Sequence, residues 1–184
     1  VAGEIPDSGK SLKTNPVVEV VKAMTLEEKV FMVIGNKNNY WSEHNFLGVG
    51  ATYQCDRLGI PPAILDDGPA GLRIPFKREG DAVAGGEART YHCTAFPTAT
   101  ALAASWNPQL NEQVGATMGN EVLEYGSDVL LTPAINIQRD PLCGRNFEYY
   151  SEDPYLTGKM AVAMIRGVQS QGVGTSLKHF AVNN

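Results

Sequence analysis

The stretch Leu130–Pro154, LLTPAINIQRDPLCGRNFEYYSEDP, changes from apolar to highly polar in its middle. Its first residues are apolar and partly β-branched, and they predict a strand buried on both faces. The charged residues that follow are mixed with proline and glycine, a composition typical of loops. An α/β protein places binding groups in such loops, because the rigid sheet orients their side chains. The alternative is a loop whose charges are simply solvated.

Amphipathic helices are predicted on both sides of this stretch. The first begins at Asn107-Pro108, an N-cap followed by proline, and Gly126 ends it. The second begins at Pro154 and ends before Gly172. Both have apolar residues at every fourth position, which predicts one buried face on each helix. These residues are Leu110, Val114, Met118 and Val122 in the first helix and Leu156, Met160, Met164 and Val168 in the second.

The N-terminal part is expected to contain an arm, two helices and a long loop. Residues 1–15 are polar and form the arm. Helices follow Pro16, and the second starts at a capping box in which Thr25 and Glu28 satisfy each other's backbone N–H groups. The loop spans residues 36–59, where Trp41 is expected to pack on the body of the domain.

Three further segments are predicted as strands: Pro62–Leu65, Phe96–Ser105 and Val173–Leu177. Asp66 and Asp67 follow the first of them, where adjacent carboxylates either cap a turn and face water or point one side chain into a site. Strands that alternate with helices indicate a parallel sheet with right-handed crossovers. Both a (β/α) barrel and an open doubly wound sheet fit this pattern.

Ionisable residues follow the carboxyl ends of three predicted strands. They are Asp67, the charged group within Arg139–Glu148, and the pair Lys178-His179. Because parallel strands end at the same edge of a sheet, we expect these groups to share a pocket. Carboxylate acceptors and cationic donors together suit the vicinal hydroxyls of a sugar ring. A phosphate-binding site would be expected to contain cationic groups without the carboxylate of Asp67.

Two alternatives concern individual residues of this pocket. Asp66, Asp67 and His179 are a loose candidate for a metal site, with fewer ligands than a metal would normally select. His179 alone is more often a hydrogen-bonded core histidine than a ligand. We therefore expect no metal.

Composition narrows the class of protein. The chain has 184 residues, 43% of them hydrophobic and 19% charged, which is typical of a globular domain. A net charge of -5 without a basic cluster argues against nucleic acid as a partner, and no apolar run approaches the roughly eighteen residues of a membrane span. No G-x-G-x-x-G follows a strand, so no nucleotide cofactor is expected.

The cysteines bear on the cellular compartment. Cys55, Cys93 and Cys143 are odd in number and widely spaced, which favours free thiols in a reducing setting. A cytoplasmic location is therefore slightly favoured over secretion. The chain starts at Val1, so a removed signal peptide stays an alternative.

Five stretches, in matching order and spacing, resemble the N-terminal domain of glycoside hydrolase family three, the β-glucosidase family. They are MTLEEKV at Met24–Val30, LDDGPAGLR at Leu65–Arg73, RDPLCGRNFEYYSEDPYLTG at Arg139–Gly158, GVQSQGV at Gly167–Val173 and KHFAVNN at Lys178–Asn184. The third is long and highly specific.

The resemblance implies a fold and an activity. Residues 16–184 would form about the N-terminal half of a (β/α)8 TIM-like barrel, which in the family precedes an α/β sandwich domain. The family removes terminal β-linked sugars from the non-reducing end with retention, through a covalent glycosyl-aspartate. We favour a β-glucosidase, with a β-xylosidase or arabinosidase of the same family as the alternative. An N-acetylglucosaminidase is not expected. That branch of the family has the motif K-H-F-P-G-H-G-D-T, whereas K-H-F is followed here by Ala181–Asn184.

The resemblance also implies site residues. Asp67 corresponds to the carboxylate that binds sugar hydroxyls in the glycone subsite, and Arg145, Lys178 and His179 correspond to its partners. Arg73 is expected near the bound sugar, but the resemblance implies its direct contact with the sugar less strongly. From its spacing, Glu148 is expected to orient Arg145.

The family's nucleophile and acid/base motifs are not found in this chain, so no catalytic residue is assigned to it. Retaining chemistry needs two carboxyl groups about 5–5.5 Å apart, and neighbours in sequence such as Asp66 and Asp67 rarely face each other across a substrate. We expect the remaining part of the enzyme as another chain or a continuation. The alternatives are a non-catalytic sugar-binding half barrel and a metal-dependent hydrolase.

Overall fold

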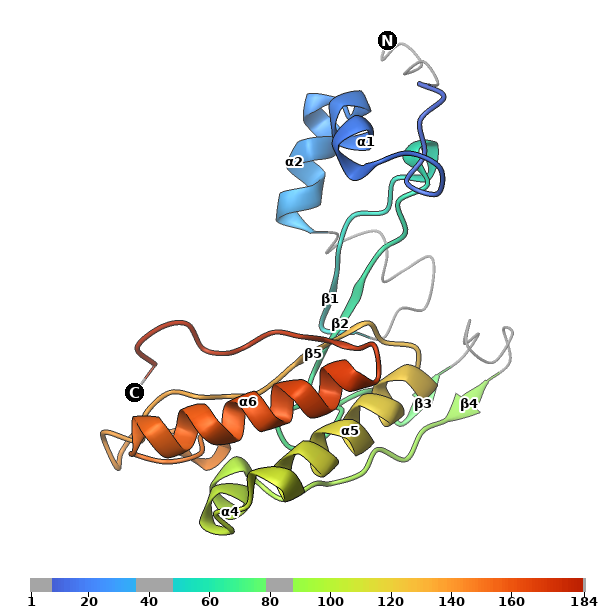
Figure 1. The fold of residues 1–184 in the computed structure, drawn as a ribbon. Coiled ribbons are helices and arrows are strands. Elements are labelled where there is room, and N and C mark those ends of the chain that lie inside the picture. Colours follow the sequence, from blue (N-terminus) through green and yellow to red (C-terminus); the bar gives the residue numbers. More distant parts are fainter. Residues whose placement is uncertain (1–7, 36–47, 79–87, 184) are drawn as a thin grey trace.

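The computed structural model describes residues 8–35, 48–78 and 88–183 (Figure 1). The prediction for Trp41 lies outside these residues. Along the chain the elements are α1 (Val17–Ala23), α2 (Leu26–Ile34), β1 (Gly50–Ala51), the 3-10 helix η1 (Asp56–Leu58), β2 (Ile64–Asp67), β3 (Lys77–Arg78), β4 (Arg89–Thr90), α4 (Ala99–Ala104), α5 (Pro108–Glu124), β5 (Val129–Leu131), the 3-10 helix η2 (Asn146–Glu148), α6 (Pro154–Ser170) and β6 (Gly174–Thr175).

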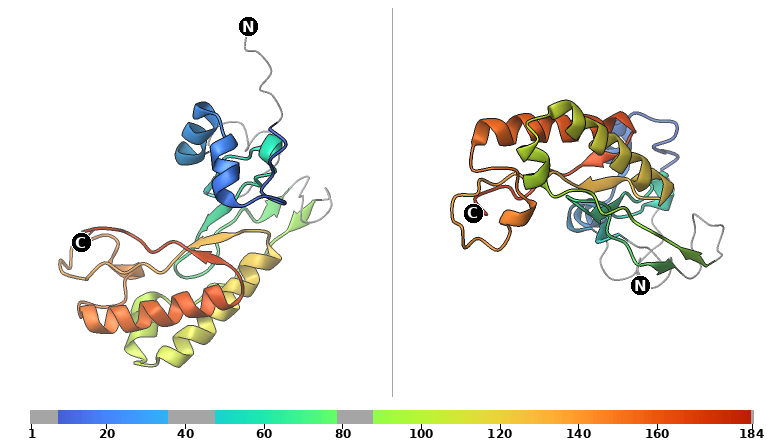
Figure 2. Two further views of the ribbon diagram at one scale, coloured as in Figure 1. Left: turned by 45° about the horizontal axis from the view of Figure 1, so that its top comes forward. Right: turned by 90° about the horizontal axis from the view of Figure 1, so that it is seen from below.

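The main sheet has four strands in the order β1-β2-β5-β6. Strands β2, β5 and β6 are parallel, and β1 is antiparallel to β2. The chain passes through α4 and α5 between β2 and β5, and through α6 between β5 and β6 (Figure 1). The view from below in Figure 2 shows α4, α5 and α6 together on one side of these strands. The expected alternation of parallel strands with helices is therefore confirmed.

The main core lies between the sheet and the helices α5 and α6. The predicted stripe of α6 is confirmed at Met160, Met164 and Val168, which are fully buried. In α5 the prediction was wrong for Leu110, which is 41% exposed, because the buried face begins one residue later at Asn111. Helix ends follow the predicted signals: Asn107 and Asp153 accept backbone N–H groups, and a proline begins each helix.

Helices α5 and α6 approach each other closely at glycine positions. A Cβ atom on Gly167 would lie 2.1 Å from the carbonyl oxygen of Glu112, and one on Gly115 would lie 2.7 Å from the carbonyl oxygen of Met164. Only hydrogen fits at these two positions. The backbones of the two helices are therefore in direct contact at these glycines.

Helices α1 and α2 form a second, smaller cluster beyond strands β1 and β2 (Figure 1). The predicted capping box is confirmed: Thr25 Oγ1 accepts from the N–H of Glu28, whose carboxylate accepts from the N–H of Thr25. Arg57 Nη2 donates to Glu28 Oε2 at 2.7 Å. The Arg57 hydrogen bonds outweigh burial and lower the pKa of Glu28 from 4.5 to about 2.

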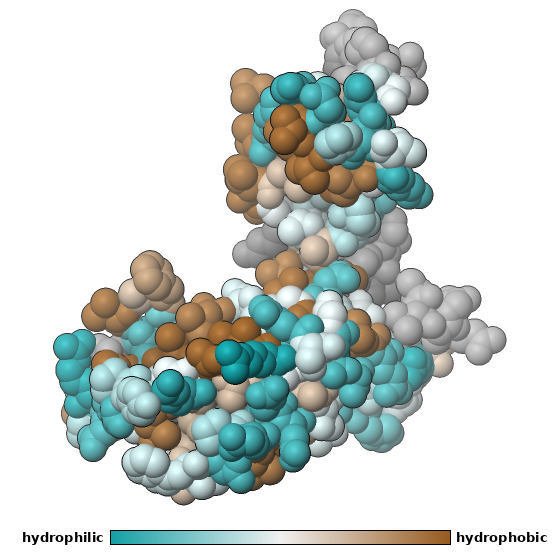
Figure 3. All heavy atoms as spheres, in the orientation of Figure 1, coloured by the Kyte–Doolittle hydropathy of each residue, from teal (hydrophilic) through white to brown (hydrophobic). Residues whose placement is uncertain are grey.

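Apolar side chains gather on the outer surface of this small cluster (Figure 3). The most exposed of them are Leu26 at 80%, Val33 at 83%, Ile34 at 65%, Val18 at 64% and Val17 at 62%. Among the described residues, no helix has the length and apolar character needed to cross a membrane.

Three strand predictions and one loop prediction need correction. Strand β6 covers only Gly174–Thr175, whereas Val173–Leu177 was predicted. The described part of the predicted loop at residues 36–59 contains β1 and η1. The segment Phe96–Ser105 was wrongly predicted as a strand, because Ala99–Ala104 forms helix α4. Alanine has the highest helix propensity of all residues, and four of these six residues are alanine. Strand β2 begins two residues later than predicted and includes Asp66 and Asp67, so their side chains alternate between the faces of the sheet instead of forming a turn.

Candidate functional site

The site is centred on an ion pair between the ends of two strands. Asp67 is the last residue of β2, and Lys178 follows β6, where its backbone bridges to Ala134 after β5. Lys178 Nζ donates to Asp67 Oδ1 at 2.6 Å. The side chain of Lys178 is 13% exposed and that of Asp67 is 25% exposed, so the pair is largely shielded from water but not fully buried.

Arg73 provides a second cation for Asp67. Its backbone N–H donates to the carbonyl oxygen of Asp67 at 2.9 Å, and Nη1 lies 3.3 Å from Asp67 Oδ2. Burial alone would raise the pKa of Asp67, but the Lys178 hydrogen bond and the charges of Lys178 and Arg73 lower it below its ordinary value. Asp67 therefore stays ionised, and each of its oxygens can accept one further hydrogen bond besides the contact with its cation.

A buried carboxylate holds a third cation. Glu148, in η2, has a side chain that is 3% exposed, and its Oε1 accepts from Arg145 Nε. Its Oε2 lies 3.8 Å from Lys178 Nζ. The hydrogen bond from Arg145 raises the pKa of that arginine, so the guanidinium is permanently charged. The contact agrees with the expectation that Glu148 orients Arg145.

His179 joins this network through both ring nitrogens. Nε2 lies 2.8 Å from Arg145 Nη2, and Nδ1 lies 2.9 Å from the hydroxyl of Tyr149. The His179 backbone N–H donates to Asn136 Oδ1 at 2.9 Å. Burial, reinforced by the charge of Arg145, lowers the pKa of His179 below its ordinary value, which favours a neutral imidazole at pH 7.

All five residues expected at the site are brought together in one connected network. They are Asp67, Arg73, Arg145, Lys178 and His179. Sequence reasoning missed Asn136, Tyr149 and Asn183, which hold members of the network in place. Tyr149 lies in the polar part of the stretch Leu130–Pro154, and only the fold shows that its hydroxyl reaches His179.

The side chain of Asp66 contacts Ser127, a residue outside this network. Its side chain is fully buried, and Oδ2 accepts from the hydroxyl of Ser127. The pairing of Asp66 with Asp67 across a substrate is therefore not seen. The described residues contain no group of three or more His, Cys, Asp or Glu side chains that could hold a metal ion.

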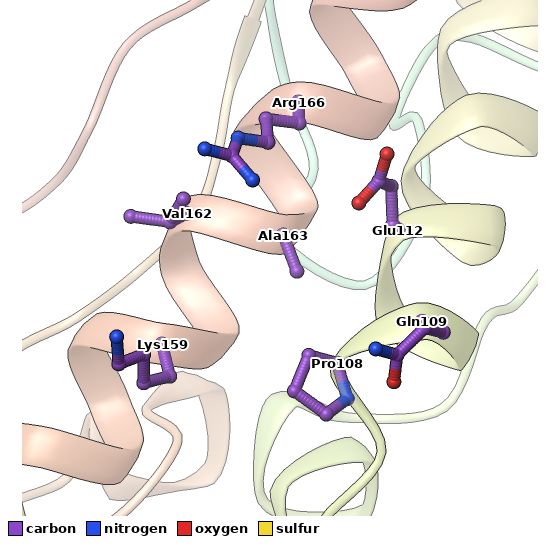
Figure 4. A pocket seen from close by; sticks show the side chains of 7 residues that line it. All are labelled: Pro108, Gln109, Glu112, Lys159, Val162, Ala163 and Arg166. Carbon is purple, nitrogen blue, oxygen red and sulfur yellow. The ribbon is translucent and has the colours of Figure 1, made fainter.

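A separate pocket of about 250 Å³ lies between the outer surfaces of α5 and α6 (Figure 4). Its lining residues are Pro108, Gln109, Glu112, Lys159, Val162, Ala163 and Arg166. Glu112 and Ala163 point toward the gap between the two helices, and none of the five site residues lines it (Figure 4). This pocket is formed by the two helices and is separate from the charged site at the strand ends.

Parallel strands joined by helices, with charged groups gathered at the strand ends, define an α/β fold with its candidate site at the carboxyl edge of the sheet. Residues 66–183 match the family described as Glycosyl hydrolase family 3 N terminal domain, and the chain belongs to this family.

Several relatives are similar over most of this chain. Thermostable beta-glucosidase B from Acetivibrio thermocellus is 46% identical over 91% of the chain and 20% of the relative. An exo-alpha-(1->6)-L-arabinopyranosidase from Bifidobacterium longum is 44% identical over 89% of the chain and 20% of the relative. The chain therefore spans about one fifth of the length of these relatives.

A solved structure confirms the expected fold class. Beta-glucosidase 3B from Thermotoga neapolitana in complex with glucose superposes with a TM-score of 0.81 at 52% identity, covering 91% of this chain and 23% of that protein. The chain is an α/β domain that forms part of a TIM-like (β/α)8 barrel.

Proposed function

We propose that the protein carrying this chain is a retaining, exo-acting β-glucosidase that hydrolyses terminal, non-reducing β-D-glucosyl residues. In this proposal the chain supplies the glycone subsite. The observation that carries it is the largely shielded Asp67–Lys178 pair with Arg145 and His179 beside it, all at the end of β2 or in the segments that follow β5 and β6. Relatives named β-glucosidases support the choice of sugar.

The network offers what a sugar ring requires. A hydroxyl group both donates and accepts, so it binds best between an anionic acceptor and a cationic donor. Asp67 is the acceptor, and Lys178 has three N–H donors, of which Asp67 takes one. Charge-assisted hydrogen bonds of this kind contribute about 1.5–3 kcal/mol each.

The bond-breaking carboxylates are proposed to lie outside this chain. Retention needs a nucleophile and an acid about 5–5.5 Å apart. Asp67 is committed to Lys178 and Arg73, and Asp66 is buried against Ser127. The glycosyl-aspartate would form on a residue supplied by a continuation of the chain or by another chain.

The test is hydrolysis of an aryl β-D-glucoside by the full-length protein. We expect turnover with retention, and kcat/KM higher for the β-D-glucoside than for the matching β-D-xyloside or α-L-arabinopyranoside. The second candidate, a xylosidase or arabinosidase, is supported by the 44% identical arabinopyranosidase and predicts the reverse order. Binding of glucose without turnover of any of the three would favour a sugar-binding module.

A further inference from the structure

The contacts of His179 constrain where its ring carries a proton. Nε2 lies 2.8 Å from Arg145 Nη2, and an arginine side chain has donors but no acceptor. Nε2 must therefore be the unprotonated nitrogen. In a neutral imidazole the proton then sits on Nδ1, which lies 2.9 Å from the Tyr149 hydroxyl.

We infer that Tyr149 is a positioning residue: it accepts from Nδ1–H and, together with Arg145 at Nε2, stabilises the neutral Nδ1–H form of His179, in which Nε2 is a hydrogen-bond acceptor. Nδ1–H donates to the Tyr149 hydroxyl oxygen. Nε2 accepts from Arg145. In the part concerning the sugar, this inference rests on the proposed function: a hydroxyl of the glycone donates to Nε2.

Burial and several hydrogen bonds hold Tyr149 in one position. Its side chain is fully buried, and its hydroxyl oxygen also accepts from Asn183 Nδ2 at 2.7 Å. Its backbone carbonyl accepts from Thr100 Oγ1 at 2.8 Å and from Gln138 Nε2 at 2.9 Å. Burial raises the pKa of the phenol, so it stays neutral over the physiological range.

The charges around His179 agree with a neutral ring. Arg145 and Lys178 face it as cations, and Glu148 and Asp67 face it as anions. Burial acts first and Arg145 second to lower the pKa of His179. A proton on Nε2 would point an N–H at the guanidinium, so the arrangement disfavours both the imidazolium and the Nε2–H form.

This arrangement gives the candidate site two hydrogen-bond acceptors that differ in charge. Asp67 is an anion, whereas His179 Nε2 is a neutral acceptor next to a fixed cation. A hydroxyl that donates to Nε2 can accept from Arg145 at the same time, so both partners are used without adding charge. Loss of the Tyr149 hydroxyl removes the acceptor for Nδ1–H, so that Arg145 alone then favours the Nδ1–H form.

Imidazole ¹⁵N NMR of the full-length protein, labelled at histidine, tests the inference independently of activity. His179→Gln assigns the signal. We expect Nδ1 protonated and Nε2 unprotonated at pH 7 in the unliganded protein. A spectrum with Nε2–H or with an imidazolium would overturn the inference, and this outcome does not depend on which sugar the protein hydrolyses.

Tyr149→Phe is the variant, and Tyr150→Phe is its matched control. Tyr150 is the next residue and is also buried, but its hydroxyl contacts Asn111 Nδ2 at 3.4 Å and not His179. We expect Tyr149→Phe to raise the share of the Nε2–H form without abolishing the Nδ1–H form, because Arg145 still opposes a proton on Nε2. We expect kcat/KM to fall by about tenfold, as for one lost hydrogen bond. Tyr150→Phe should leave the tautomer and kcat/KM unchanged.

Two results separate the inference from the proposed function. If the wild-type protein hydrolyses no β-D-glucoside, the proposed function fails, while the NMR result still decides the tautomer. If the wild-type protein is active and Tyr149→Phe keeps both the wild-type tautomer and the wild-type kcat/KM, the positioning role of Tyr149 is overturned.

Discussion

Lys178 and Asp67 are 111 positions apart in the sequence, yet Lys178 Nζ lies 2.6 Å from Asp67 Oδ1. The two residues follow β6 and end β2, the strands on either side of β5. The sheet therefore brings them together, and Glu148 supports the lysine from the loop after β5 at 3.8 Å. A pair this shielded is sensitive to loss of either partner, because the remaining charge is left without compensation.

Replacing the cation of this pair should change the pH dependence of activity. Lys178 lowers the pKa of Asp67, so Lys178→Met raises it, and Asp67 then becomes protonated at a higher pH than in the wild type. We expect the acid limb of the kcat/KM–pH profile for an aryl β-D-glucoside to move to higher pH. The control Lys159→Met lies on the exposed surface of α6 and should leave the limb in place. An unmoved limb in Lys178→Met would contradict the assignment.

Glu148→Gln tests the support of the two cations. Gln keeps the size of the side chain but removes the charge that holds Arg145 and faces Lys178. The loss of one charge-assisted contact, about 1.5–3 kcal/mol, should lower kcat/KM roughly 10- to 100-fold. Glu112→Gln, on the exposed side of α5, is the control and should behave as wild type. Equal kcat/KM values for the two variants would exclude the supporting role.

Two glycines of α6 predict opposite effects on stability. A Cβ on Gly167 would meet the backbone of Glu112, so Gly167→Ala should force α5 and α6 apart and destabilise the protein by about 1–3 kcal/mol. A Cβ on Gly158 meets nothing within 4 Å, so Gly158→Ala should stabilise the helix by about 0.5–1 kcal/mol. Thermal unfolding of the full-length protein measures both. Changes of the same sign would contradict the close helix contact.

The ion pair of Glu28 predicts a loss of stability in acid. Its pKa falls from 4.5 to about 2 on folding, so the pair stabilises the folded state above about pH 4.5 and is lost as the pH falls toward 2. The shift corresponds to about 3 kcal/mol at neutral pH. Glu28→Gln should lower the free energy of unfolding at pH 7 by about this amount and only slightly at pH 2. Glu27→Gln, exposed and adjacent, is the control, and a difference that persists undiminished at pH 2 would refute the linkage.

Local signals in the sequence predicted the helices more accurately than the strands. Thr25 with Glu28, and Asn107 with Pro108, are short-range signals, and the structure places helix ends at them. Strands depend on partners far away in the chain, so their bounds are weakly encoded. In Phe96–Ser105 the small apolar residues suit a buried strand as well as a buried helix, and the alanines decide for the helix.

The sequence predicted those site residues that are charged and come directly after a strand. Asp67 and Lys178 were expected to converge because parallel strands end at one edge, and the resemblance to the family specified Arg145. The supporting contacts were not predictable: Tyr149 and Asn136 differ in no local feature from ordinary core and loop residues. Their roles depend on distances set by the fold.

The central claim is that the charged rim at the strand ends binds the non-reducing sugar. Its most direct test is kcat/KM of full-length Asp67→Asn on an aryl β-D-glucoside, with Asp56→Asn as an exposed control. The loss of the anionic acceptor should cost about 2–4 kcal/mol in transition-state binding, a decrease of roughly 30- to 1000-fold. An Asp67→Asn protein that retains the kcat/KM of wild type, with the control unchanged, would contradict the account.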